Sequence, residues 1–132
     1  MSLELPGKVK ELIEAKNFGS LATIMPDGSP HVAPVWIDHD GRDVLINTAE
    51  GRQKMKNMRR DPRIAMDILN QENPYEMVAL RGHVVDITHE GADAHIDKLS
   101  KKYTGQDVYG NRRPGEQRVI VRIRPDWIAG RR

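Results

Sequence analysis

The chain has 132 residues, a formal net charge of +2, 38% hydrophobic residues and 30% charged residues. This length fits one domain, residues 1–132, because a chain of this size buries roughly two-thirds of the surface that its unfolded form exposes. The lack of cysteine excludes disulfides, thiolate catalysis, zinc fingers and iron–sulfur clusters. With no apolar signal core and no apolar run of membrane length, the sequence predicts a soluble cytoplasmic protein.

The start of the chain predicts a helix followed by a strand. The helix begins at Leu5-Pro6, since proline favours the first turn, and Asn17 is its expected end. Residues 18–25 are small, β-branched and apolar, which favours a strand. Residues 26–29 (PDGS) predict a turn, because proline sets the first corner and glycine accepts positive φ.

Two further strands are predicted before residue 48. Residues 31–37 form the returning strand, with Pro34 inside it. Because proline has no N–H to donate, Pro34 marks an edge, a bulge or a place where a ligand replaces the neighbouring strand. Residues 38–41 predict a second turn and residues 43–47 a third strand, so these strands predict an antiparallel meander.

A basic segment, residues 48–63 (TAEGRQKMKNMRRDPR), follows the third strand. Between Gly51 and Arg63 it contains six cations and one acid, and residues 53–60 favour a helix that Pro62 ends. A strand that runs into a turn and a cationic helix start combines free N–H groups, a positive dipole end and side-chain charge. The segment therefore predicts an anion site, for which phosphate is the usual occupant. The alternative is a solvated surface helix whose Met55 and Met58 face the core.

The remaining chain predicts three more strands and a second long helix. The strands are residues 64–69, 75–88 and 117–124, the helix is residues 90–103, and polar loops fill residues 70–74 and 105–116. Arg81-Gly82 predicts a bend of the kind that barrels need at corners, and Pro125 is the expected end of the last strand. The pattern predicts a mainly β (α+β) fold closed into a small six-stranded barrel. The modest apolar content predicts a homodimer.

Side chains that carry out catalysis directly are not apparent. The five histidines include no pair at the i, i+4 spacing of a helical metal site, so no metal is predicted. No serine lies in a nucleophile-elbow pattern, and covalent acyl chemistry is not predicted. We therefore assign no catalytic residue.

Two motifs in this order carry a resemblance to a known family. They are PDGSPHVAPVW, residues 26–36, and the basic segment, residues 48–63. The chain resembles the flavin-binding split-barrel family related to pyridoxamine-phosphate oxidase, and most closely its actinobacterial-type members that bind the deazaflavin coenzyme F420. The resemblance implies a six-stranded antiparallel split β-barrel with a few peripheral helices. The C-terminal Arg and His signature of pyridoxamine-phosphate oxidase is missing, which argues against pyridoxamine phosphate as the substrate.

The resemblance also implies a set of cofactor-binding residues. Arg52 and Lys54 hold the phosphate end, with the Thr48 hydroxyl close by, and Asn57 orients Lys54 or the phosphate. The ring lies against a wall formed by the strand that contains Pro34. Backbone groups at the end of the third predicted strand bind the ring, and a partner protomer closes the site. These further residues are Pro34, Val35 and Trp36 of the wall, Asn47 and Thr48 of the strand end, and Tyr75 and Met77 of the partner.

Three functions remain open at this point. The first is an oxidoreductase that uses coenzyme F420 to transfer hydride to a small or planar organic acceptor. The second is an enzyme or storage protein for FMN. The deazaflavin carries a polyglutamate tail, and the surplus cations Lys56, Arg59 and Arg60 favour the first. The third, a nucleic-acid-binding module, is disfavoured because acids are interleaved with the basic residues outside residues 52–63.

Overall fold

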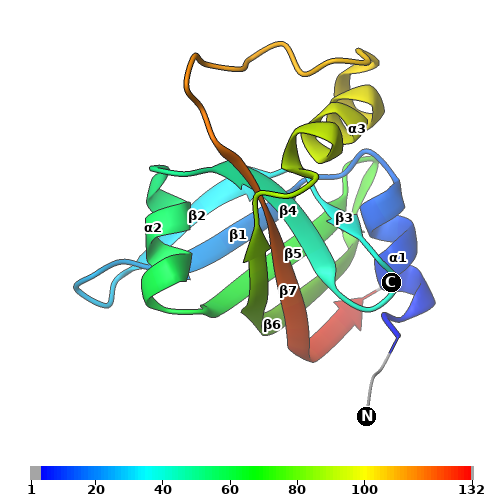
Figure 1. Cartoon of the computed structure of the whole chain (residues 1–132). Coiled ribbons are helices and arrows are strands. Elements are labelled where there is room, and N and C mark those ends of the chain that lie inside the picture. The colour runs from blue at the N-terminus through cyan, green and yellow to red at the C-terminus, as the bar shows by residue number, and fades with distance from the viewer. Residues whose placement is uncertain (1–3, 132) are drawn as a thin grey trace.

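The centre of the molecule is one antiparallel sheet of seven strands. The structure, a computed structural model, describes residues 4–131 (Figure 1). The elements in chain order are α1 (Gly7–Glu14), β1 (Gly19–Ile24), β2 (Pro30–Val35), β3 (Asp38–His39), β4 (Val44–Ala49), α2 (Gln53–Arg60), β5 (Arg63–Asn70), β6 (Asn73–Thr88), α3 (Ala92–Thr104) and β7 (Arg118–Arg131). The strand order is β2-β1-β5-β6-β7-β4-β3, so β2 and β3 are the two edges.

The sheet curls because its two longest strands bend together. The register between β6 and β7 shifts at Arg81/Gly82 and again at Val84/Asp86. At the first shift the backbones are so close that a Cβ on Gly82 would collide with the carbonyl oxygen of Arg124. Only glycine fits there, and the predicted bend at Arg81-Gly82 is confirmed.

The concave side of the curled sheet holds the hydrophobic core. Alternate residues of β4 and β7 are fully buried there, and β1, β5 and β6 add further aliphatic side chains. The helix α1 packs on β3 and β5, α2 packs on β1, and α3 packs on β4 and β7. In α1 the buried residues Val9, Leu12 and Ile13 recur at helical spacing, as predicted. The mainly β, split-barrel prediction is therefore confirmed.

The predicted number of six strands was wrong by one. Asp38 and His39, predicted as part of a turn, pair with Leu45 and Val44 to form the short edge strand β3. The predicted meander was also wrong. The strand β2 pairs with β1 as a meander requires, but it lies at the edge opposite β3 and is not a neighbour of β4, the predicted third strand. The chain passes between the two edges at residues 36–37, which leaves the sheet split there. Pro34 does lie in an edge strand, where a proline is tolerated.

The predicted end of the last strand was also wrong. The strand β7 continues through Pro125 to Arg131. Pro125 is paired with Gly82 at the register shift, and a proline is tolerated where the ladder is irregular. The predicted loop at residues 70–74 is instead a tight turn between β5 and β6.

Candidate functional site

A cleft of about 230 Å³ lies at the split between β2 and β4. The helix α3 and the loop of residues 105–117, seen at the top of Figure 1, contribute to its lining. Its lining residues come from seven parts of the chain: Phe18, Pro34, Val35, Trp36, Asn47, Thr48, Arg52, Lys54, Ile96, Tyr109, Asn111 and Arg118. The cleft therefore depends on sheet topology and on no single local motif.

One end of the cleft is strongly cationic. Arg52, Lys54 and Arg118 line it, and no carboxylate is among the described residues of its wall. Glu116 lies beside it, 3.2 Å from Nη1 of Arg118 and 3.5 Å from Nη2 of Arg52. Three cations thus share one carboxylate, which leaves an excess of two positive charges. This arrangement attracts an anion of about two charges, such as a phosphate group.

Lys54 is the least compensated of these cations. Burial, together with the positive charges of Arg52 and Arg118, lowers the pKa of the Lys54 ammonium. Among residues 4–131 its Nζ has neither a hydrogen bond nor an ion pair. A partly buried ammonium with three donors and no acceptor is expected to bind one from outside the chain.

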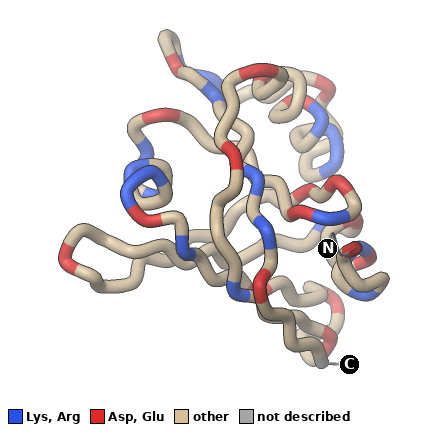
Figure 2. Tube along the Cα trace, turned by 60° about the horizontal axis from the view of Figure 1, so that its bottom comes forward, with Lys and Arg blue, Asp and Glu red and all other residues tan. Residues whose placement is uncertain are grey.

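The helix α2 places Lys54 at the cleft because one face of the helix packs in the core and a neighbouring face borders the cleft. Met55 and Met58 are 1% and 2% exposed and pack in the core, while Lys54 reaches the cleft. Gly51, with φ of 89°, turns the chain from β4 into the helix, which begins at Gln53 without a side-chain cap. Its first N–H groups are therefore not capped by a side chain. The Lys and Arg segments of α2 are the blue helix at the left of Figure 2.

The surplus cations of α2 are partly used within the protein. Arg59 donates from Nε to Oε1 of Glu50 at 3.2 Å, and Arg60 donates to the carbonyl oxygen of Ile24. Lys56 is exposed. Two of the three surplus cations thus already have partners within the protein, which leaves fewer positive charges for a polyanionic tail than the sequence indicated.

The other end of the cleft is aromatic and rigid. Trp36 stacks on Tyr103 with ring centres 5.1 Å apart and planes at 4°, and Tyr109 meets Trp36 edge-on at 5.9 Å. Phe18 stacks on the same Tyr103 at 5.5 Å. Stacked and edge-to-face geometry is the favoured arrangement for aromatic pairs, so this end offers a fixed, flat wall.

The hydroxyl of Tyr103 ties α3 to the chain at two places next to that wall. The O–H donates to the carbonyl oxygen of Asn17 at 2.6 Å and accepts from the N–H of Ile37 at 3.1 Å. Burial raises the pKa of Tyr103 to about 12, so the hydroxyl stays protonated and keeps its donor. The residue is in α3 and does not itself line the cleft.

The structure brings seven of the ten predicted cofactor residues together. Pro34, Val35, Trp36, Asn47, Thr48, Arg52 and Lys54 all line the cleft. Asn57 does not: it is fully buried and donates to Oγ1 of Thr23 at 3.0 Å, which fastens α2 to β1. Tyr75 and Met77, predicted to act from a partner, lie in β6 outside the cleft wall, and Tyr75 is 76% exposed.

Thr48 lines the cleft, and its hydroxyl is not used within the described part of the protein. Its hydroxyl oxygen is buried and has no hydrogen-bond partner among the described residues. Alternation along β4 places its side chain on the same face as Ile46, which is fully buried in the core. The neighbouring Asn47 faces the other way, toward α3 and Arg118.

Arg118 is the most important lining residue that the sequence did not identify. It begins β7, and its partner in the ladder is Ala49 at the end of β4, next to the turn that leads to Arg52. The alternation of charged residues in β7 was visible in the sequence, but the register that sets Arg118 beside Lys54 was not. Tyr109 and Asn111 come from a loop whose position has no sequence signal.

Three further side chains with the chemistry to contact a ligand do not line this cleft. Arg112 binds Oδ1 of Asp97 at 3.2 Å and the carbonyl oxygen of Asp93 at 3.1 Å, so it ties the loop to α3. Trp127 lies 4.3 Å below the guanidinium of Arg81, beside a separate groove of about 510 Å³ on β1, β5, β6 and β7. His31 is in β2 but does not line the cleft.

Metal-binding clusters and membrane-spanning helices are both absent from residues 4–131. No group of three or more His, Asp or Glu side chains there is arranged to hold a metal ion. No helix in that part of the chain is both long enough and apolar enough to cross a membrane.

The chain is similar to a known family over almost its whole length. The family model described as pyridoxamine 5'-phosphate oxidase matches residues 5–132. A solved F420 reductase is 32% identical, with 95% of this chain and 98% of that chain covered and a TM-score of 0.81. The conserved hypothetical protein Rv2991 of Mycobacterium tuberculosis is 25% identical, with coverages of 98% and 86% and a TM-score of 0.76. General Stress Protein 26 of Bacillus anthracis, 19% identical with coverages of 94% and 91% and a TM-score of 0.68, shares the fold.

Proposed function

Because the chain belongs to the pyridoxamine 5'-phosphate oxidase family, whose members bind flavin-type cofactors, we propose that it is an oxidoreductase that holds coenzyme F420 in the cleft. Its acceptor is a small or planar organic molecule. The observation that carries the proposal is the Lys54 ammonium, which has no partner among residues 4–131 and lies at the cationic end of a cleft whose other end is flat and aromatic. In a cofactor made of a phosphate joined to a planar ring, the phosphate matches the cationic end of the cleft and the ring matches the aromatic end. The similarity to an F420 reductase favours the deazaflavin over FMN.

The residues of the cleft fit such a cofactor. Arg52, Lys54 and Arg118 bind the phosphate by charge-assisted hydrogen bonds, which are the stronger kind. Pro34 and Trp36 support the ring from one side, since an apolar wall excludes water from the reacting face. When bound, the deazaflavin supplies the hydride chemistry, and the protein contributes binding, orientation and electrostatics. None of these roles requires a side chain that acts as an acid or a base.

The cofactor site is completed by a second copy of the chain. The volume of about 230 Å³ lies below the roughly 300–1,000 Å³ usual for a ligand pocket, so one protomer covers only part of the cofactor. Tyr75, exposed in the protomer, is the candidate contribution from the partner together with Met77. In this homodimer a Tyr75→Ala variant binds the cofactor more weakly although Tyr75 is outside the cleft of its own protomer. A monomeric protein by light scattering would contradict this arrangement.

Titration with F420 and with FMN, side by side, tests the cofactor. Lys54→Ala removes one phosphate partner, so affinity falls by about 1.5–3 kcal/mol, the range for a hydrogen bond to a charged group. Lys8→Ala is the control, because it removes the same charge from α1, which contributes no residue to the described wall of the cleft. Tighter binding of FMN than of F420 would reassign the cofactor. Equal affinity in wild type and Lys54→Ala would remove the cationic end from the site.

A further inference from the structure

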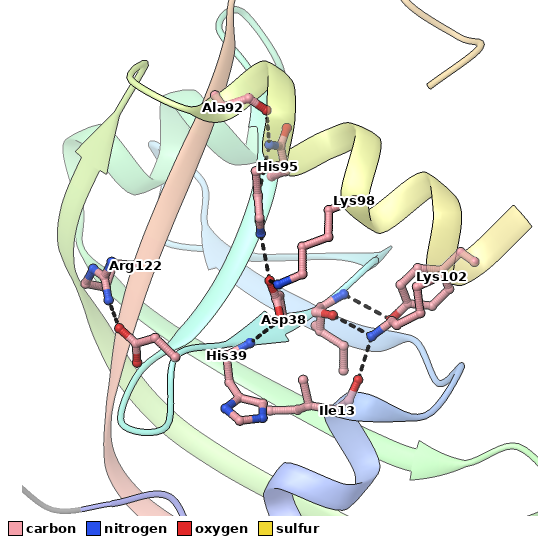
Figure 3. Close-up of polar contacts among 12 residues, drawn as sticks. Ile13, Asp38, His39, Ala92, His95, Lys98, Lys102 and Arg122 are labelled. Atoms are coloured by element: carbon pink, nitrogen blue, oxygen red, sulfur yellow. Dashed lines mark hydrogen bonds and ion pairs between the residues drawn. The ribbon is translucent and has the colours of Figure 1, made fainter. Parts of the chain in front are cut away.

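Behind the wall of the cleft, His95 of α3 lies between an acid and an amide (Figure 3). Its Nε2 is 3.0 Å from Oδ2 of Asp38, and its Nδ1 is 3.2 Å from Nδ2 of Asn47. The imidazole is 8% exposed. Because these two neighbours are its ring partners, any change in what the ring donates or accepts changes their hydrogen bonds.

The surrounding groups determine where the protons are. Arg118 can only donate, so the Asn47 atom that it meets at 2.9 Å must be the oxygen. The Asn47 nitrogen then donates to the carbonyl oxygen of Ala92 at 2.8 Å and to Nδ1 of His95. Nδ1 is therefore an acceptor, and the ring proton is on Nε2, from which it donates to Asp38. Neutral His95 thus satisfies every polar atom of this chain of contacts.

This chain of contacts ends in the cleft. Asn47 and Arg118 both line it, and the Arg118 side chain is only 4% exposed. Arg118 is held from two sides, by Asn47 and by Glu116. The position of a cleft cation therefore depends on an amide whose orientation depends on His95.

We propose that His95 is a positioning residue, which in its neutral form holds Asn47 and through it Arg118 in the geometry that binds the cofactor phosphate, and which weakens that binding when it takes up a second proton. The proposal rests on the function proposed above. It concerns a residue that does not touch the cleft and makes cofactor affinity a function of pH.

A second proton on His95, at Nδ1, would have no hydrogen-bond acceptor opposite it. Protonated Nδ1 faces the N–H of Asn47, so two donors oppose each other at 3.2 Å. Turning the amide over does not help, because the oxygen would then face the Ala92 carbonyl and the nitrogen would face Arg118. Either orientation loses at least one hydrogen bond, so Asn47 or Arg118 must move.

The charges around His95 do not all act in one direction. Asp38 from β3 favours the charged ring. Lys98 from α3, which binds the same Asp38 oxygen at 3.2 Å, and Arg118 from β7, across Asn47, disfavour it. Lys102, also in α3, adds positive charge near Asp38.

Two variants separate the two hydrogen bonds of the ring. His95→Asn places an amide oxygen where Nδ1 stood, which keeps the acceptor for Asn47 and cannot be protonated in this range. His95→Gln keeps a donor near Asp38 but loses the acceptor for Asn47. His83→Asn is the control, since it removes an exposed histidine that binds Asp126 away from the cleft.

The dissociation constants of F420 and FMN are measured from about pH 8 to about pH 5. In wild type and His83→Asn the constant rises about tenfold toward low pH, the effect of one lost hydrogen bond. His95→Asn binds as wild type does at the upper end and shows no such rise. His95→Gln is weaker by about tenfold already at the upper end. Any titration of the ligand itself is common to all four proteins and cancels in the comparison.

The proposal is overturned if His95→Asn follows the wild-type pH dependence or if His95→Gln binds as wild type does. If wild type binds neither F420 nor FMN, the proposed function fails and NMR of the free protein decides the matter. The ¹⁵N signals must then show the Nε2–H tautomer of His95, and the Asn47 side-chain and Arg118 Nε–H resonances must move as His95 titrates. Resonances that stay fixed would overturn the proposal without any cofactor.

Discussion

Replacing Tyr103 by phenylalanine isolates what its hydroxyl contributes. The ring and its stack on Trp36 remain, while the hydrogen bonds to Asn17 and Ile37 disappear. At about 0.5–1.5 kcal/mol net for each bond, the free energy of unfolding falls by about 1–3 kcal/mol. The cofactor affinity changes little, because the aromatic wall keeps its shape.

Urea denaturation measures this loss. With a slope of about 1–3 kcal/mol/M for small proteins, the midpoint falls by on the order of 1 M. Tyr109→Phe is the matched control for stability, since it removes the same group from a tyrosine whose hydroxyl has no hydrogen bond to residues 4–131, and its effect on the free energy of unfolding stays within about 0.5 kcal/mol. Tyr103→Leu removes the stack as well and so weakens cofactor binding. A Tyr103→Phe protein as stable as wild type would refute the assignment of these two bonds as stabilising.

Further changes probe the bend, the anchor of α2 and the acid beside His95. Gly82→Ala lowers the free energy of unfolding by about 1–3 kcal/mol because its Cβ meets backbone, whereas Gly110→Ala, which meets only a side-chain tip at 3.5 Å, serves as the control in thermal melts. Asn57→Ala leaves buried partners unsatisfied and costs about 1–3 kcal/mol by urea denaturation, and a neutral result would mean that α2 is held by its methionines alone. Burial acts to raise the pKa of Asp38, but hydrogen bonds from His95 and from the His39 N–H, together with Lys98, hold it well below its usual range. A depressed pKa stabilises the folded state above the unfolded value of about 4 and loses that effect as the pH falls. The stability difference between wild type and Asp38→Asn therefore shrinks from pH 7 toward pH 3, and a constant difference would contradict this sign.

Local features of the sequence predicted most of the elements. The helix at residues 53–60 was predicted at its observed bounds, because good helix formers run up to a proline that must end them. Of the three possibilities that Pro34 indicated, an edge, a bulge or a ligand in place of a strand, the first is observed, because β2 is an edge strand. Pro125 misled for a related reason: it is tolerated at a register shift, and that shift depends on Gly82, far away in the sequence.

The candidate site was predicted where its residues are close in the sequence and missed where they are not. Arg52 and Lys54 are two residues apart in a basic segment, so their shared role was visible. Arg118 reaches them only through the pairing of β4 with β7, and His95 reaches Asn47 only because α3 packs on β4. Register and helix packing are decided by the whole core, and no short stretch of sequence records them.

The crossing at residues 36–37 is tied down in an unusual way. In a closed barrel a neighbouring strand would satisfy its backbone, but here Tyr103 takes the N–H of Ile37 and Lys102 donates to its carbonyl oxygen at 2.9 Å. Two consecutive residues of α3 therefore provide the hydrogen bonds that a neighbouring strand would otherwise provide. Substitutions that change how α3 packs can therefore change the shape of the cleft at residues 36–37 and the range of molecules that it admits. The hydrogen bonds between the strands of the sheet would be unchanged.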